Sequence, residues 1–156
     1  GKGMTKVEDP DLRALTKRLL EPAPKVEEGQ ALALSRSVTS MMDNSDGLAL
    51  SLYELAEASG VGFSVQEEKI PIDPSVRMVA EDEGDAIDLA LHAGGDFELV
   101  FTVSPDRIEV AANACNLSVI GEVLAEKEMV IESDMGRRAL EPRGYQHMMK
   151  LSTTPP

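Results

Sequence analysis

The pattern of hydrophobic and polar positions along the 156-residue chain predicts helices and strands that interleave. The clearest helix begins after Asp46 and ends at Gly60 and Gly62, where the helical spacing of apolar residues stops. Its inward face is predicted to comprise Leu48, Leu52, Leu55 and Ser59. Other helices are expected within 9–21, 27–37, 74–94 (in two parts around Gly84) and 104–116. Strands are expected within 37–43, 61–72, 97–103 and 117–133, the last as two strands with a turn near Glu126 and Lys127, followed by an irregular tail over 136–156.

This order of elements indicates the fold class. Some strands follow one another with no helix between them, which a doubly wound parallel sheet does not allow. The chain is therefore expected to be α+β, with a mixed, largely antiparallel sheet and helices packed mainly on one side of it. Its length is typical of one domain with a core of its own. Because aromatic residues make up only 3% and Trp is absent, Leu, Val, Ile, Ala and Met must form that core.

Charge narrows the classes of partner. The chain has 28 Asp and Glu against 15 Lys and Arg, a net charge of −13. Nucleic acid and anionic membrane surfaces repel such a protein, so neither is expected as a partner. The balance is compatible with a divalent cation or a cationic ligand, and equally with an acidic surface that is only solvated. The single cysteine, Cys115, excludes an internal disulfide, suits a cytoplasmic protein and is expected to be a small buried thiol.

The candidate chemistry lies where the strand before Asp43 meets the following helix. Asp43, Ser45 and Asp46 fall at the helix N-terminus, which carries unpaired N–H groups and partial positive charge. Either Ser45 or Asp46 would serve as a helix cap, but one cap needs one residue and the second carboxylate is then surplus. Two carboxylates together with substrate phosphate oxygens are what Mg²⁺ prefers, so Asp43 and Asp46 are candidate metal ligands.

A calcium-binding EF-hand loop is excluded by counting. If Gly47 is placed at loop position 6, Met42 falls at position 1 and Tyr53 at position 12, where carboxylates are required. The metal interpretation therefore concerns Mg²⁺ and a nucleotide phosphate, with the helix cap as the alternative.

Several blocks of the sequence, taken together, resemble a known family. They are "MDNSDGLALSLYELAEASGVG" (42–62), "ALHAGGDFELVFTV" (90–103), "VIGEVL" (119–124) and "EPRGYQHM" (141–148). In this order they are similar to the C-terminal domain of thiamine-monophosphate kinase, a member of the aminoimidazole ribonucleotide synthetase superfamily. The resemblance covers nearly the whole chain, from "LLEPAPKVEEGQALA" (19–33) onward. It implies the fold of that domain and an ATP- and Mg²⁺-dependent transfer of phosphate to thiamine monophosphate, giving thiamine diphosphate.

The resemblance also implies roles for individual residues. In the family's Asp-x-Ser-Asp-Gly motif the aspartates bind Mg²⁺ and the serine contacts ATP, which assigns Asp43 and Asp46 to the metal and Ser45 to ATP. The family's substrate-contacting Glu falls here on Gly95, so Asp96 or the backbone is expected to take over that contact. A tight turn that needs glycine is the structural alternative for Gly94 and Gly95.

Tyr145 matches the aromatic residue that lies against the family's substrate. Packing over the sheet edge is the alternative for this ring. With Gly95 and Asp96, Tyr145 completes the expected substrate-binding set.

The family comparison also bears on domain organisation. Its members have an N-terminal half that carries nucleotide-binding segments and most of the dimer interface, and no such half is found here. Residues 1–156 are therefore expected to be one C-terminal domain of a longer, homodimeric, two-domain kinase, inactive alone, with 1–10 an expression remnant or linker and 148–156 a flexible tail. The alternatives are another ATP-dependent enzyme of the superfamily, of the synthetase type, or a non-catalytic assembly domain.

Overall fold

A computed structural model describes residues 21–145. Helices and strands interleave along it up to α6, the last three strands follow one another directly, and two short 3-10 turns, η1 and η2, complete the elements. The helices are α2 (Val26–Ser35), α3 (Leu48–Ser59), α4 (Pro74–Val79), α5 (Glu83–His92) and α6 (Ile108–Ala114); the 3-10 turns are η1 (Glu67–Lys69) and η2 (Pro105–Arg107). The strands are β1 (Val38–Asp43), β2 (Gly62–Gln66), β3 (Leu99–Val103), β4 (Gly121–Leu124), β5 (Met129–Ser133) and β6 (Gly136–Ala139).

The strands form two sheets. β1 and β3 pair antiparallel, with Asp43 opposite Leu99, so the end of β1 lies beside the start of β3. The other four strands are ordered β4-β2-β5-β6, and only the β2–β5 pair is parallel. The predicted α+β class with mixed, largely antiparallel pairing is confirmed, but the strands divide between two sheets.

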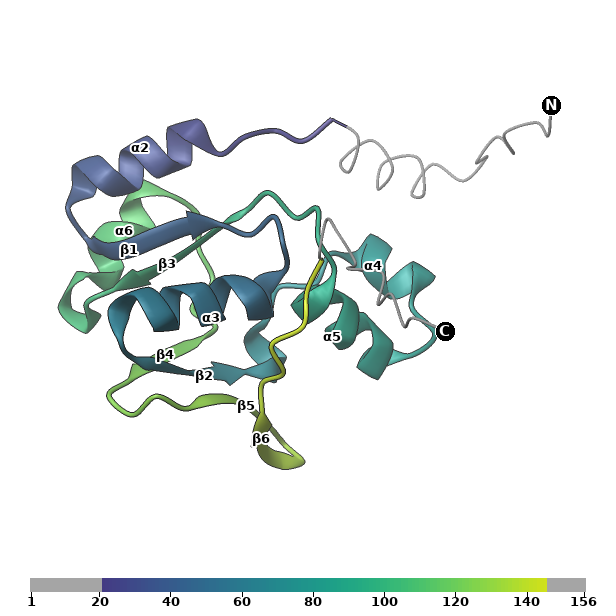
Figure 1. Ribbon diagram of the computed structural model, residues 1–156. Helices are drawn as coiled ribbons and strands as arrows, with labels where there is room; N and C mark the ends of the chain where they lie inside the picture. The colour runs from purple at the N-terminus through teal and green to yellow at the C-terminus, as the bar shows by residue number, and fades with distance from the viewer. Residues whose placement is uncertain (1–20, 146–156) are drawn as a thin grey trace, which may run out of the picture.

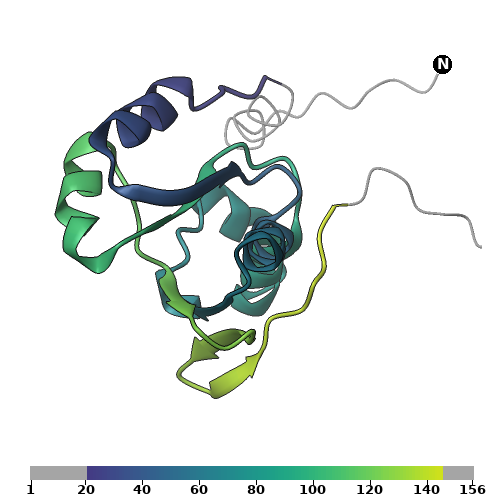
Figure 2. The same cartoon turned by 60° about the vertical axis from the view of Figure 1, so that its left-hand side comes forward.

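Helix α3 lies between the two sheets. Figure 1 shows α2 and α6 on one side of the β1–β3 pair and α3 on its other side, above β2 and β4. Figure 2 views α3 nearly end-on, with one sheet on either side of it. The expectation that helices cover mainly one side of a single sheet is therefore wrong, because α3 packs against both sheets and cannot belong to an outer layer.

The main core forms around α3. Leu52 and Leu55 are buried on its inward face, as the helical spacing predicts, and Ile131 of β5 is fully buried. The hydroxyl of Tyr53 donates a hydrogen bond of 2.7 Å to the carbonyl oxygen of Leu140, which ties α3 to the segment after β6. The core cluster comprises Leu48, Ala49, Leu52, Leu55, Ala56, Phe63, Val65, Ile70, Leu91, Ile131 and Leu140. Burial of this apolar surface is the main term that stabilises the domain.

The two strands expected within 117–133 are confirmed as β4 and β5, with β2 between them in the sheet. Two other sequence-based expectations about single elements are wrong. Residues 136–139 form β6 and pair with β5, where an irregular tail was expected. The break between α4 and α5 falls at 80–82, so Gly84 lies inside α5. Residues 9–20 of the helix expected within 9–21, and residues 146–156 of the expected tail, lie outside the described residues.

Burial differs from the pattern at a few positions. Ser59 is exposed although it was predicted on the inward face of α3, and Met41 of β1 is 37% exposed although its side chain is apolar. Both faces of β2 are buried, so Ser64 is covered as fully as Phe63. The Ser64 hydroxyl donates to a carboxylate oxygen of Glu132 at 3.0 Å, which satisfies its hydrogen-bonding need on the buried strand.

Candidate functional site

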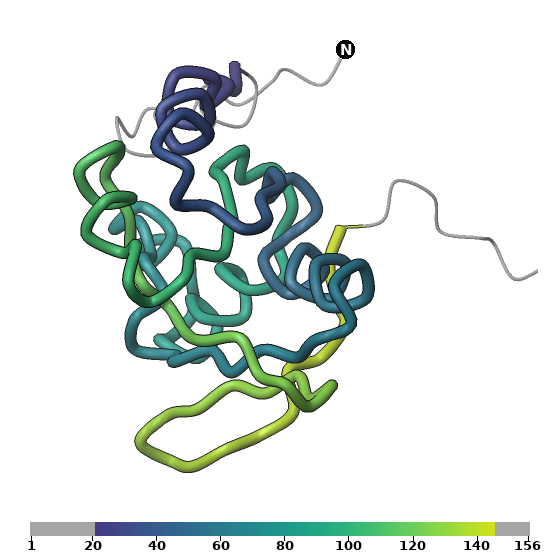
Figure 3. The backbone as a smooth tube through the Cα atoms, turned by 90° about the vertical axis from the view of Figure 1, so that its left-hand side faces the viewer, coloured from purple at the N-terminus to yellow at the C-terminus, as the bar shows by residue number. Residues whose placement is uncertain are grey.

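Three segments that are far apart in the sequence meet at the N-terminal end of α3. They are the loop 43–47, the turn 94–96 after α5, and the strap, by which we mean residues 141–145 after β6. Figure 3 shows the strap, in yellow, running beside the blue-teal coil of α3. Each segment contains residues that the sequence analysis assigned to metal, ATP or substrate. The structure therefore brings the candidate residues into one region.

The first junction joins the loop to the turn. The backbone N–H of Gly95 donates a 2.8 Å hydrogen bond to the carbonyl oxygen of Ser45. Gly95 has φ +92°, a conformation that residues other than glycine adopt with strain, so the predicted tight turn is confirmed at this position. A side chain on Gly94 would overlap the side chain of Tyr145. Glycine is thus needed at both positions for structural reasons.

A second junction joins the loop to the strap. The backbone N–H of Tyr145 donates a 2.9 Å hydrogen bond to the carbonyl oxygen of Asp46. A Cβ atom on Gly144 would overlap that same carbonyl oxygen and the Leu50 side chain, so only glycine allows the strap to approach this closely. Arg143 anchors the strap through a 2.6 Å ion pair with Asp88 of α5.

Glycine also lets the loop itself approach α5. Gly47 has φ +101° and precedes the first residue of α3. A Cβ atom here would lie 3.2 Å from the carbonyl carbon and oxygen of His92, closer than most side chains tolerate. The chain can therefore turn from β1 into α3 beside the end of α5 only with glycine at this position.

The two candidate metal ligands have no structural partner. Asp43 and Asp46 are both exposed, and within residues 21–145 no hydrogen bond or ion pair engages either carboxylate. Gly47 occupies the N-cap position of α3, and no side chain caps that helix. The alternative that Ser45 or Asp46 is a helix cap is therefore wrong. By contrast, the Asp82 carboxylate caps α5 by accepting a 2.9 Å hydrogen bond from the Asp85 N–H.

The donor set fits Mg²⁺ carried by a nucleotide better than a closed metal site. In the part of the chain from 21 to 145, no group of three or more His, Cys, Asp or Glu side chains is arranged to hold a metal ion. Asp43 and Asp46 thus offer two carboxylates at most. Mg²⁺ is commonly bound by one or two carboxylates, with phosphate oxygens and waters completing its octahedron, and that requirement matches this pair.

Asp96 lies at the same junction. As a residue it is exposed, but surrounding atoms displace water from its carboxyl group, and this desolvation raises its pKa above the usual value. A hydrogen bond of 3.2 Å from Nδ2 of Asn44 to Oδ2 of Asp96 acts in the opposite direction. The negative charge of Glu98 raises the pKa of Asp96 further, whereas a hydrogen bond from the Glu98 backbone and the positive charge of Lys25 lower it.

Two residues of this region have structural roles that the sequence analysis did not assign. Asn44 is 7% exposed and links the loop to Asp96, while Gly144 seats the strap. Asn44 lies between two candidate residues, but nothing in the local pattern shows that its side chain points inward. Gly144 belongs to the "EPRGYQHM" block, in which only the aromatic residue had been given a role. Tyr145 itself is 54% exposed, so it is not a core residue.

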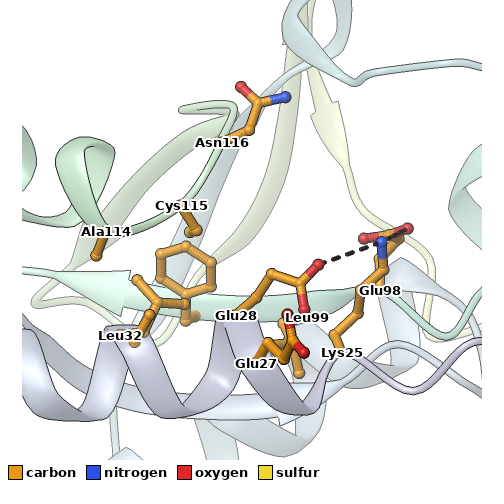
Figure 4. Close-up of a pocket in the computed structure, with 11 residues that line it drawn as sticks. Lys25, Glu27, Glu28, Leu32, Glu98, Leu99, Ala114, Cys115 and Asn116 are labelled. Carbon is orange, nitrogen blue, oxygen red and sulfur yellow. Dashed lines mark ion pairs between the residues drawn. The ribbon is translucent and has the colours of Figure 1, made fainter.

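A separate hollow of about 610 Å³ lies on the other side of the β1–β3 sheet, at the start of α2 (Figure 4). Its lining is Lys25, Glu27, Glu28, Ala31, Leu32, Glu98, Leu99, Phe101, Ala114, Cys115 and Asn116. Lys25 pairs with Glu98 across it at 2.9 Å. Cys115 is a free thiol that is partly buried, and desolvation with the negative charge of Glu28 raises its pKa. None of the candidate metal, ATP or substrate residues lines this hollow.

Comparison with known proteins first identifies the protein family to which the chain belongs. The family model described as "AIR synthase related protein, C-terminal domain" matches residues 4–134. The chain belongs to this family. The predicted resemblance at the superfamily level is therefore confirmed.

More specific relatives are thiamine-monophosphate kinases. The protein of that name from Halobacterium salinarum is 39% identical over 132 residues, covering 83% of this chain and 43% of the relative. A solved structure described as AaThiL complexed with AMPPCP and TMP has a TM-score of 0.77 and 27% identity, covering 92% of this chain and 44% of the other. E. coli HypE, a hydrogenase maturation protein, has a TM-score of 0.62 and 26% identity, covering 82% of this chain and 42% of the other.

These matches agree with the resemblance inferred from the sequence blocks. The chain spans less than half the length of the relatives that it matches. Within residues 21–145, no helix is long and apolar enough to cross a membrane.

Proposed function

We propose that this domain is the C-terminal half of a longer two-domain kinase that transfers the γ-phosphate of ATP to thiamine monophosphate in the presence of Mg²⁺. The observation that supports this most is the convergence of loop 43–47, turn 94–96 and the strap at one end of α3. Each contains a block on which the family resemblance rests. The longer protein is expected to be a cytoplasmic homodimer, and the isolated domain to be inactive.

In this proposal the protein acts mainly by positioning and by charge. Asp43 and Asp46 hold the metal ion, and the Ser45 hydroxyl contacts ATP. Mg²⁺ bound with the nucleotide would neutralise charge that develops on the phosphates during transfer. The N-terminus of α3, which no side chain caps, directs its partial positive charge toward the same phosphates.

The substrate side is formed by the turn and the strap. Asp96 presents a carboxylate, which suits the cationic thiazolium ring of thiamine monophosphate. Gly95 offers no side chain at the position of the family's glutamate, so its backbone is left for contact. Tyr145 is 54% exposed, its Cβ lies beside Gly94, and in this proposal its ring lies against the flat ring of the substrate.

Substituting Asp43→Asn in the full-length polypeptide tests the metal role. The amide keeps the size of the side chain but loses its charge, so we expect kcat/KM for thiamine monophosphate to fall at least about 100-fold. Steady-state assays over a range of Mg²⁺ concentrations measure this, with the Asp106→Asn variant as control. Asp106 is an exposed carboxylate on η2, which follows β3 at the end of the β1–β3 pair opposite to the loop. Unchanged kinetics for Asp43→Asn would exclude Asp43 as a metal ligand.

The structural likeness to HypE keeps a second class of function open, in which the full-length protein activates a carbonyl or amide oxygen with ATP or acts in assembly. Calorimetry of the full-length protein separates these cases. Binding of thiamine monophosphate, with ATP turnover that depends on it, supports the kinase. ATP turnover without any response to thiamine monophosphate favours the synthetase type, and the absence of turnover favours an assembly domain.

A further inference from the structure

Asn44 is a buried amide within a loop whose carboxylates are exposed. Its side chain is 7% exposed, whereas Asp43 and Asp46 face solvent. Burying an amide is unfavourable unless its polar atoms find hydrogen-bond partners. The position between the first aspartate and the serine has no assigned role in the Asp-x-Ser-Asp-Gly motif. The inward direction of this side chain therefore needs an explanation of its own.

The hydrogen bonds of Asn44 supply that explanation, because together they reach two other parts of the fold. Its backbone N–H donates to the carbonyl oxygen of Glu98 at 2.9 Å. Its Nδ2 donates to Oδ2 of Asp96 at 3.2 Å. Its Oδ1 faces the Ser51 hydroxyl of α3 at 3.4 Å. One residue thus links the loop after β1, the segment before β3 and the first turns of α3.

We propose that Asn44 is a positioning residue, which holds the carboxylate of Asp96 at a fixed place relative to the carboxylates of Asp43 and Asp46. This inference rests on the proposed function, in which Asp96 faces substrate while Asp43 and Asp46 face metal. The backbone bond from Gly95 to Ser45 fixes the two segments, but it does not reach the Asp96 carboxylate. The Asn44 amide holds that carboxylate together with the backbone of Glu98, and Asn44 acts on substrate only through Asp96.

Kinetics of the full-length polypeptide test the role in substrate binding. Asn44→Leu keeps the size of the side chain and removes both amide groups. We expect KM for thiamine monophosphate to rise about tenfold, the loss typical of a hydrogen bond to a charged group, with KM for ATP little changed. Asn113→Leu is the matched control, because Asn113 is exposed on α6. An effect confined to the amount of folded protein, with KM unchanged, would mean a purely structural role and overturn the proposal.

A double-mutant cycle shows whether Asn44 acts through Asp96. In an Asp96→Asn background the further change Asn44→Leu should raise KM less than twofold, because the group that it positions has already lost its charge. Equal effects in both backgrounds would overturn the proposal. Asn44→Asp provides a second variant if the leucine variant does not fold. It puts an oxygen where the donor was, and repulsion from Asp96 should raise KM at least as much.

A measurement on the 156-residue chain separates this inference from the proposed function. Nuclear magnetic resonance follows the titration of the Asp96 carboxyl carbon without any assay of activity. The Asn44 hydrogen bond lowers the pKa of Asp96, so its removal in Asn44→Leu should raise that pKa, while Asn113→Leu should not. If the full-length protein does not phosphorylate thiamine monophosphate, the proposed function fails. The titration still shows whether Asn44 holds the Asp96 carboxylate. An unchanged Asp96 pKa would overturn the role of Asn44.

Discussion

The flank of α3 and its N-terminal end are held in place by different kinds of interaction. Along its flank, Leu52 and Leu55 fill the space between two sheets, and the side chains themselves make the structure. At its N-terminal end, backbone carbonyl oxygens of Ser45 and Asp46 accept the hydrogen bonds that hold the neighbouring segments, and glycines allow the close approach. The side chains of Asp43 and Asp46 are thus left without a structural role. A site can combine a rigid backbone with carboxylates that remain free for a ligand.

A substitution in the core around α3 is expected to have the largest effect on stability. Leu52→Ala removes a side chain that is 4% exposed from the space between the two sheets. We expect the free energy of unfolding to fall by about 2–5 kcal/mol, because a cavity remains where the side chain was. Urea denaturation followed by circular dichroism measures it. A loss below about 1 kcal/mol would show that the two sheets do not close on α3 as described.

The junction with the strap predicts a smaller loss from a backbone cause. In Gly144→Ala the added Cβ would overlap the Asp46 carbonyl oxygen and the Leu50 side chain. Relieving that overlap should lower the free energy of unfolding by about 1–3 kcal/mol. Gly29→Ala in α2 is the control, since its Cβ would meet the Leu99 side chain at an ordinary 3.6 Å and alanine favours the helix. If both variants gain stability equally, the strap does not pack against the loop.

The cap of α5 predicts the smallest of these losses. The Asp82 carboxylate accepts a hydrogen bond from the Asp85 N–H, so Asp82→Ala should lower the free energy of unfolding by about 0.5–2 kcal/mol. Thermal and urea unfolding of this variant give the size of the effect that a structural carboxylate has in this protein. An absence of any loss would remove the contrast with Asp46, which caps no helix.

A region of this fold can be predicted from the sequence where burial imposes a periodic pattern on it, and not where its position depends on distant neighbours. The flank of α3 is readable because burial imposes a helical period on Leu48, Leu52 and Leu55. Strand β6 is not readable, since its sequence Gly-Arg-Arg-Ala has no apolar alternation and pairing comes from its neighbours. Arg138 reaches Glu67, and Arg137 reaches Glu128 at 2.9 Å. The position of β2 between β4 and β5 is likewise a tertiary property with no local signal.

In the candidate site, the types of residue indicated the candidate chemistry, but they did not indicate which residues contact one another. Asp43, Ser45 and Asp46 stand out as polar groups at a strand–helix junction, and their roles toward metal and ATP stay predictions. The inward direction of Asn44 could not be predicted, because a polar residue in a polar loop gives no periodic signal. The seating of Gly144 on the Asp46 carbonyl group joins residues about 100 positions apart, and no local pattern reports such a contact.

In this structure the carboxylates of Asp43 and Asp46 are expected to contribute nothing to folding. The most direct test is the free energy of unfolding of the Asp43→Asn/Asp46→Asn double variant of the 156-residue chain, measured in urea without added metal. We expect a value within about 0.5 kcal/mol of the unchanged chain, or slightly higher because two negative charges leave an acidic protein. A loss of about 2 kcal/mol or more would show that these side chains support the fold and are not reserved for a ligand.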